Sequence, residues 1–106
     1  MIYVFDIDDT ICTKSVADDY SSCSPIKERI NIVNRLYDEG HTIIMMTARG
    51  MCRSKGNQNA ADELMREITE AQLSDWGVKY NDLYFGKPFA DFYIDDKAIN
   101  DKDFFQ

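Results

Sequence analysis

The chain has 106 residues, of which 44% are apolar and 29% are charged. This length and composition predict one globular domain that spans residues 1–106, and they argue against a disordered chain. No apolar run reaches the roughly 18 residues of a membrane span, and Asp6 interrupts the first such run. We therefore expect neither a membrane span nor a secretory signal peptide.

The net charge is −7, from 12 Lys and Arg residues against 19 Asp and Glu residues. Such a charge repels a polyanion on average, so it argues against binding of a long nucleic acid. The charge is unevenly distributed, because residues 40–61 contain no acid while Arg49, Arg53 and Lys55 lie there. This stretch is either a solvated basic loop or a site for a small anion.

The three cysteines, Cys12, Cys23 and Cys52, show no CxxC spacing. An odd number of scattered cysteines predicts reduced thiols and a cytoplasmic location. Together with the single histidine, His41, they are too few to predict a zinc site.

The first apolar run, residues 2–5, predicts a strand buried on both faces, as in a parallel sheet, and it leads directly into Asp6 and Asp8. The polar residues 11–24 predict an irregular flap. Ser24 and Pro25 predict the N-cap and first position of a helix that ends at Gly40. The apolar face of that helix consists of Ile26, Ile30, Val33, Leu36 and Tyr37.

Residues 42–47 predict a second buried strand, which ends at Thr47. A polar loop over residues 48–59 follows. Residues 60–76 predict a second helix that is ended by Gly77. Its expected apolar face consists of Ala61, Leu64, Ile68 and Ala71.

Two further apolar runs complete the pattern. Residues 92–94 predict a fourth strand, which ends at Asp95 and Asp96. Residues 83–85 predict either a third strand or a short edge segment, because a parallel crossover needs roughly a dozen residues and few separate the two runs. Residues 98–105 predict a short helical turn.

This alternation of strands and helices predicts an α/β, three-layer Rossmann-like domain with a mostly parallel central sheet. In such sheets, ligands bind at the carboxyl ends of the strands. Polar groups follow three of the predicted strands at this end. They are Asp6 and Asp8, Thr47, and Asp95 and Asp96.

Several carboxylates at one sheet edge repel each other unless a cation lies between them. Mg²⁺ prefers oxygen ligands and is often bound by carboxylates together with a substrate phosphate. Thr47 can donate a hydrogen bond to a phosphate oxygen, and either Lys87 or Lys79 can supply a positive charge. The combination predicts a magnesium-dependent phosphoryl-transfer site.

The chain resembles the haloacid dehalogenase (HAD) superfamily of aspartate-nucleophile phosphatases in four motifs. Asp6–Thr10 matches the first motif, DxDx[TV] after an apolar strand, although Asp9 stands where glycine is commonest. The run Ile43–Thr47 matches the second, Lys87 the third and Phe92–Asp96 the fourth. The resemblance covers residues 2–96.

The resemblance implies a role for each matched residue. Asp6 is expected to be the nucleophile that forms an aspartyl-phosphate, and Asp8 the general acid and base. Thr47 and Lys87 are expected to bind the phosphoryl oxygens, and Arg49 to contact the substrate. The expected Mg²⁺ ligands are Asp6, Asp8, Asp95 and Asp96.

A narrower similarity, carried by Met46–Met51 and Gly86–Pro88, is to the small capless phosphatases encoded with capsule and polysaccharide biosynthesis genes. It implies a sugar phosphate as substrate and an open site without a cap domain. It is also compatible with a homo-oligomer, although Phe85 is expected in the core and the last two aromatic residues equally fit docking onto their own domain. The candidate interface residues are Tyr84, Phe85, Phe89, Phe104 and Phe105.

Three alternatives remain open. One is a phosphatase that acts on nucleotides or on nucleic-acid ends. Another is a phosphoacceptor domain of the receiver type, which is disfavoured because no acid follows the strand at residues 42–47. The last is a non-catalytic protein that binds a phosphorylated ligand on the same fold.

Overall fold

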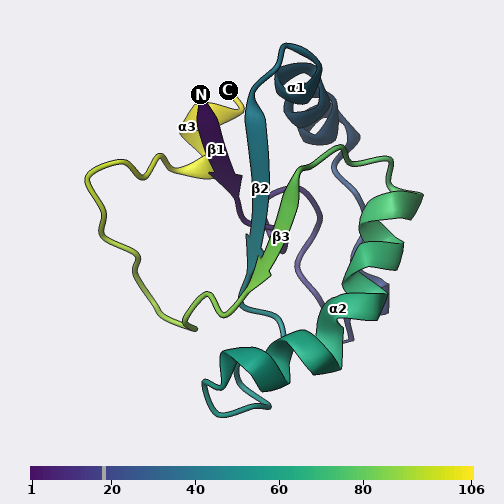
Figure 1. Cartoon of the computed structure of the whole chain (residues 1–106), viewed down its shortest axis with the longest axis vertical. Helices are drawn as coiled ribbons and strands as arrows, with labels where there is room; N and C mark the ends of the chain where they lie inside the picture. The colour runs from purple at the N-terminus through teal and green to yellow at the C-terminus, as the bar shows by residue number, and fades with distance from the viewer. Residues whose placement is uncertain (18) are drawn as a thin grey trace.

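The sheet positions every candidate site residue that follows a strand. The structure is a computed structural model that describes residues 1–17 and 19–106. Strands β1 (Ile2–Phe5), β2 (Thr42–Thr47) and β3 (Asp82–Phe85) form one parallel sheet in the order β1-β2-β3 (Figure 1). All three carboxyl ends therefore lie at the same edge of the sheet, as the sequence predicts.

Two helices form the connections between neighbouring strands. Helix α1 (Lys27–Asp38) lies between β1 and β2, and helix α2 (Gln58–Asp75) lies between β2 and β3. Two shorter helices are η1 (Tyr20–Ser22), in the flap before α1, and α3 (Asp101–Phe104), near the end of the chain. Among the described residues, no helix is both long enough and apolar enough to cross a membrane.

One face of the sheet carries the core. Along β1, Tyr3 and Phe5 face the helices, whereas Ile2 and Val4 point the other way and are 70% and 58% exposed. Tyr84 on β3 is exposed in the same way. The α/β class and the parallel sheet are confirmed, but the described residues build two of the three expected layers, because no helix covers this second face.

The sequence placed the start of the first helix too early. Ser24 and Pro25 are extended, since Pro25 forms an isolated bridge with Cys12. Helix α1 begins at Lys27, and its N-cap residue Ile26 makes no side-chain capping bond. The backbone N–H of Ile26 instead donates to the carbonyl of Ile11 at 2.8 Å, so pairing with the flap replaces the expected cap.

The buried face of α2 also differs from the prediction. The inward residues are Ala61, Met65, Thr69 and Leu73, whereas Leu64 and Ile68 are 50% and 43% exposed. A polar threonine lies on the inner face because a buried arginine hydrogen-bonds to it there. The need for this hydrogen bond outweighs the periodicity of apolar residues that predicted a different inward face of α2.

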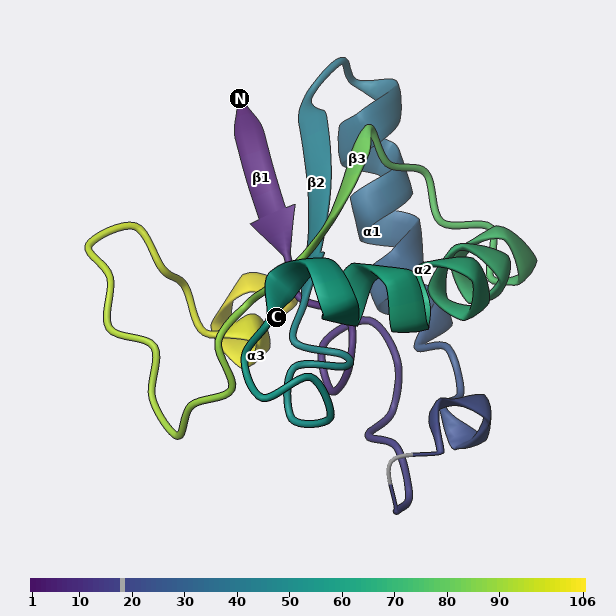
Figure 2. The same cartoon turned by 60° about the horizontal axis from the view of Figure 1, so that its bottom comes forward.

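The two C-terminal apolar runs have different outcomes. Residues 82–85 form β3, a true parallel edge strand paired with β2. Residues 92–94 do not form the predicted fourth strand, and Phe92 and Ile94 are 82% and 97% exposed. The segment 86–100 begins at the end of the sheet, where the N–H of Lys87 donates to the carbonyl of Thr47 at 3.2 Å, and then forms a long arc between β3 and α3 in both views (Figures 1 and 2).

The last aromatic residues dock onto their own domain. Phe104 packs edge-on against Phe5 with ring centroids 5.5 Å apart, and Phe105 lies 5.9 Å from the same ring. Phe85 is buried, as expected. Of the candidate interface residues, Tyr84 and Phe89 remain exposed.

Asp9 has a left-handed backbone, with φ of 61°. The turn it belongs to is closed by the backbone N–H groups of Thr10 and Ile11, which both donate to the carbonyl of Ile7. Aspartate tolerates this conformation better than most residues, and glycine adopts it without strain. An aspartate at position 9 is therefore compatible with the turn.

We expect Asp9→Val to lower the free energy of unfolding by about 1–2 kcal/mol, because a β-branched residue is strained at positive φ. Asp9→Gly should change it by less than about 1 kcal/mol, because relief of strain opposes the added entropy of the unfolded chain. Urea denaturation followed by the fluorescence of the single tryptophan, Trp76, measures both. Equal stability of the two variants would contradict a left-handed Asp9.

Candidate active site

A cleft of about 240 Å³ lies at the carboxyl ends of the three strands. Residues that follow each strand line it, including Asp6 and Asp8 after β1, Ala48 after β2 and Lys87 after β3. Segments distant in sequence therefore meet at one site. The cleft is open, since the described residues include no cap domain between these strands.

Asp6 and Lys87 face each other in this cleft. The Lys87 Nζ lies 3.7 Å from Asp6 Oδ1, and the Thr10 hydroxyl donates to Asp6 Oδ2 at 3.4 Å. The other lysine candidate, Lys79, precedes β3 and pairs with Asp38 at 2.8 Å. Lys87 is thus the lysine beside the acid, and Lys79 lies at the opposite edge of the sheet.

The environment of Asp6 disfavours its charged form. Burial raises the pKa of the Asp6 carboxyl above its ordinary value of 3.8, and the charge of Asp8 raises it further. Lys87, the N–H of Ile7 and the Thr10 hydroxyl oppose this shift in part. The charge of such a carboxylate is only partly neutralised by its neighbours. A carboxylate of this kind in a cleft is suited to react with, or to bind, a positively charged partner.

This shift has a measurable effect on stability. The native state binds the Asp6 proton at higher pH than the unfolded chain, so this group lowers stability as pH rises from about 3.8 through the raised native pKa. We therefore expect Asp6→Asn to raise the Tm at pH 7. The Tm difference between Asp6→Asn and the wild type should disappear at a pH below the ordinary carboxyl pKa of 3.8, where Asp6 is protonated in both the folded and the unfolded state.

Thermal denaturation of both proteins across this pH range provides the measurement. Asp91→Asn, on the exposed segment 86–100, is the matched control and should not change the Tm. A lower Tm for Asp6→Asn at neutral pH would show that Asp6 is stabilised as a carboxylate.

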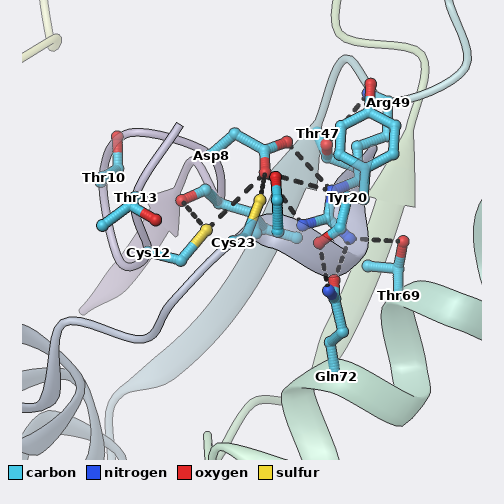
Figure 3. A network of polar contacts seen from close by, with 12 residues as sticks. Asp8, Thr10, Cys12, Thr13, Tyr20, Cys23, Thr47, Arg49, Thr69 and Gln72 are labelled. Atoms are coloured by element: carbon cyan, nitrogen blue, oxygen red, sulfur yellow. Dashed lines mark hydrogen bonds and ion pairs between the residues drawn. The ribbon is translucent and has the colours of Figure 1, made fainter. Parts of the chain in front are cut away.

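Asp8 forms a close ion pair with Arg49 (Figure 3). The Arg49 Nη2 donates to Asp8 Oδ1 at 2.9 Å, and Nε donates to Oδ2 at 3.0 Å. The guanidinium is completely buried, whereas the Asp8 side chain is 25% exposed toward the cleft. Asp8 is therefore held in a fixed orientation, with one side available to solvent.

The remaining donors of Arg49 are also satisfied inside the protein. Its Nη1 donates to the Thr69 hydroxyl at 3.1 Å and to Gln72 Oε1 at 2.5 Å, both from helix α2. Its guanidinium carbon lies 4.5 Å from the centroid of the Tyr20 ring. Arg49 also lines the cleft, but its guanidinium contacts Asp8, Thr69 and Gln72 and joins the loop to α2. A contact between Arg49 and the substrate stays a prediction.

Gly50 makes this inward position possible. A Cβ at residue 50 would lie 3.0 Å from Met65 and 3.1 Å from the backbone of Ala61, so the loop packs directly against α2. Gly50 also has a positive φ of 79°. The close approach places Arg49 beneath the loop instead of on its surface.

We expect Arg49→Met to lower the free energy of unfolding by about 2–4 kcal/mol. The variant leaves Asp8, Thr69 and Gln72 without their shared donor, and breaking a buried ion pair costs about 3–5 kcal/mol when both partners are fully buried. The partial exposure of Asp8 reduces this cost. Urea denaturation gives the value.

Arg53→Met is the matched control, since Arg53 is an exposed residue of the same loop. Its effect should stay within about 0.5 kcal/mol. Equal effects of the two substitutions would show that the buried network does not stabilise the fold.

Thr47 lies at the end of β2, as expected, but it is fully buried. Its hydroxyl oxygen accepts a hydrogen bond from the backbone N–H of Arg49 at 3.0 Å. Ala48 and Gly50, and not Thr47, line the cleft. In this structure Thr47 shapes the loop that carries Arg49.

Asp95 and Asp96 are not brought to the other acids. They lie on the exposed segment 86–100, because the strand that was expected to carry them does not pair with β1. Among the described residues, they belong to no group of three or more His, Cys, Asp or Glu side chains with closely spaced ligand atoms. The predicted four-carboxylate metal site is not assembled in this arrangement.

Some residues of the site are not evident from sequence, and Lys14 from the flap is one of them. Lys14 and Arg53, from the loop after β2, line the cleft together with Arg49 and Lys87. The basic stretch of residues 40–61 indicates Arg53. The one sequence feature that indicates Thr69 and Gln72 is their polarity on an otherwise apolar face of α2.

Comparisons with known proteins support the fold. A structural-genomics target from Vibrio cholerae has a TM-score of 0.89 and 27% identity, and the match covers 98% of this chain and 86% of that one. The D,D-heptose 1,7-bisphosphate phosphatase from B. bronchiseptica, crystallised with magnesium and phosphate, has a TM-score of 0.53 and 12% identity. That match covers 92% of this chain and 53% of the phosphatase. No protein-family profile and no curated protein sequence matches.

Proposed function

We propose that this protein is a Mg²⁺-dependent phosphomonoester hydrolase that uses Asp6 as its nucleophile. The observation that carries the proposal is the meeting of Asp6 and Lys87, 3.7 Å apart, in a cleft at the carboxyl ends of three parallel strands. A carboxylate beside a lysine at this position suits a nucleophile that attacks an anionic phosphoryl group. The heptose phosphatase, which was crystallised with magnesium and phosphate, adds support at the level of the fold.

In the proposed reaction, Asp6 attacks phosphorus and the bond to the leaving alcohol oxygen breaks. The leaving oxygen takes a proton from Asp8, and an aspartyl-phosphate remains. Asp8 then removes a proton from water, which attacks this intermediate and releases inorganic phosphate. Lys87 offsets the charge on the phosphoryl oxygens, and Arg49 keeps Asp8 oriented toward the cleft.

The donor set fits Mg²⁺ in chemical type. Asp6 and Asp8 both line the cleft with carboxylate oxygens, and the raised pKa of Asp6 supports the proposal, because a bound cation would stabilise its charged form. Bound Mg²⁺ would neutralise charge on the phosphoryl group. Asp95 and Asp96 join this set only through a rearrangement of the segment 86–100.

We propose a small sugar phosphate of polysaccharide biosynthesis as the substrate. An open cleft of about 240 Å³ with cations on its rim suits a small anionic metabolite. The heptose phosphatase acts on a sugar phosphate by name. Free nucleotides and nucleic-acid ends share the phosphomonoester and are the second candidate class.

The test is release of inorganic phosphate from a panel of sugar phosphates, nucleotides and end-phosphorylated oligonucleotides, with Mg²⁺ and with EDTA. We expect Mg²⁺-dependent release that Asp6→Asn abolishes and Lys87→Met lowers at least about tenfold, the effect of losing a positioned charge. Lys79→Met is the matched control and should retain full activity. The preferred substrate distinguishes the two classes.

Turnover that persists in Asp6→Asn would overturn the nucleophile assignment. Asp95→Asn and Asp96→Asn examine the exposed acids in the same assay. A loss of Mg²⁺-dependent release, or a higher Mg²⁺ requirement, in these variants would support their recruitment to the metal, and wild-type behaviour would leave Asp6 and Asp8 as the protein ligands.

A further inference from the structure

Two buried thiols lie against the Asp8 carboxylate, and they contact the Oδ1 atom that also accepts from Arg49 Nη2 (Figure 3). The Sγ atoms of Cys12 and Cys23 lie 3.7 Å and 3.5 Å from Asp8 Oδ1. Cys12 is fully buried and Cys23 is 7% exposed. Among the described residues, this is the group of three candidate ligands whose donor atoms all lie within 4.8 Å of one another.

We propose that Asp8, Cys12 and Cys23 form a binding site for Zn²⁺. The site is distinct in chemistry from the proposed Mg²⁺ site, because thiolate sulfur selects zinc over magnesium. Three cysteines and one histidine do not predict such a site from sequence. The fold supplies the third ligand when it brings Asp8 to the two sulfurs.

The sulfur–oxygen distances are close to those of a tetrahedral zinc centre. With Zn–S bonds of about 2.3 Å and a Zn–O bond of about 2.0 Å, a sulfur and an oxygen on one tetrahedron lie about 3.5 Å apart. The two S···O distances in this structure are 3.5 Å and 3.7 Å, and the ligand atoms of all three residues lie within 4.8 Å of one another. Little movement is needed to bind the ion, and one coordination position remains for a solvent molecule.

Charge balance also favours this cation. Zn²⁺ bound to two thiolates and one carboxylate carries a net charge of −1, and the adjacent buried Arg49 neutralises it. Zinc binding would displace both thiol protons to solvent.

The backbone around the thiols is fixed on both sides. Cys12 bridges Asp8 on one side and Pro25 on the other. The N–H of Thr13 donates to the carbonyl of Ser24 at 2.8 Å, next to Cys23. The flap therefore holds its two cysteines together before any ion binds.

Cobalt substitution tests the proposal. Co²⁺ is titrated into the full-length protein in the presence of a phosphine reductant. We expect one equivalent to give the visible bands of a tetrahedral site and a near-ultraviolet thiolate-to-cobalt charge-transfer band, and one equivalent of Zn²⁺ to displace both. A weak octahedral spectrum without the charge-transfer band would overturn the proposal.

The double variant Cys12→Ser/Cys23→Ser should lose the charge-transfer band completely, and Cys52→Ser, at an exposed cysteine, should retain it. The opposite pattern would exclude the buried pair as ligands. A second measurement uses only wild-type protein, in enough urea to expose the buried thiols transiently. There Zn²⁺ should slow the alkylation of Cys12 and Cys23 but not that of the exposed Cys52. Unchanged alkylation rates of Cys12 and Cys23 on addition of Zn²⁺ would contradict the site even where a variant fails to fold.

The zinc test requires no turnover, so it succeeds or fails independently of the proposed hydrolase activity. Zinc at this site would occupy the carboxylate that the proposed mechanism uses as acid and base. We therefore expect Zn²⁺ to inhibit phosphate release in the wild type.

Discussion

The buried guanidinium of Arg49 connects parts of the chain that otherwise share few contacts. It holds Asp8 after β1, reaches Thr69 and Gln72 on α2, and lies over Tyr20 in the flap. Gln72 in turn donates to the backbone carbonyl of Tyr20 at 2.6 Å. A buried cation is costly unless its hydrogen bonds are all made. The loops after β1 and β2, the flap and α2 must therefore adopt their positions together.

The two acids of the first motif consequently have different environments. Asp8 is held by short hydrogen bonds from a guanidinium, whereas Asp6 faces a more distant lysine across an open cleft. Two carboxylates near each other can serve separate roles when their surroundings treat their charges differently. In this structure the two acids contact different cations at different distances, and this difference provides the asymmetry.

The sheet and the alternation of elements could be predicted because short apolar runs with a helix between them leave few alternative topologies. Asp6 and Asp8 could be placed at the edge where ligands bind because they follow the first strand, whereas the choice of Lys87 over Lys79 required the structure. The burial of Arg49 could not be predicted, since it depends on Thr69 and Gln72 lying on the inner face of α2. An arginine after a strand gives no sign by itself of whether it faces solvent or the interior.

The fourth strand shows a different limit. Residues 92–94 have the composition of a buried strand, but composition does not determine whether a segment finds a partner. The pairing of Cys12 and Cys23 around Asp8 shows the converse, because residues without a recognisable spacing converge through the flap. The local sequence pattern predicts helices and strands well, whereas contacts between loops distant in sequence become evident only once the fold is known.

The unpaired side of β1 has a consequence for how copies of this chain behave toward each other. β1 is an edge strand, and its residues Ile2–Phe5 include neither the proline nor the lysine that often protects such edges. Among the described residues, no strand pairs with the outer edge of β1, and such an edge is a template for another strand. Two copies related by a twofold axis can join these edges in antiparallel fashion into one continuous six-stranded sheet, in which exposed Ile2 and Val4 of both copies would lie on a common surface. Crowded conditions, such as those of expression or crystallisation, would favour that association.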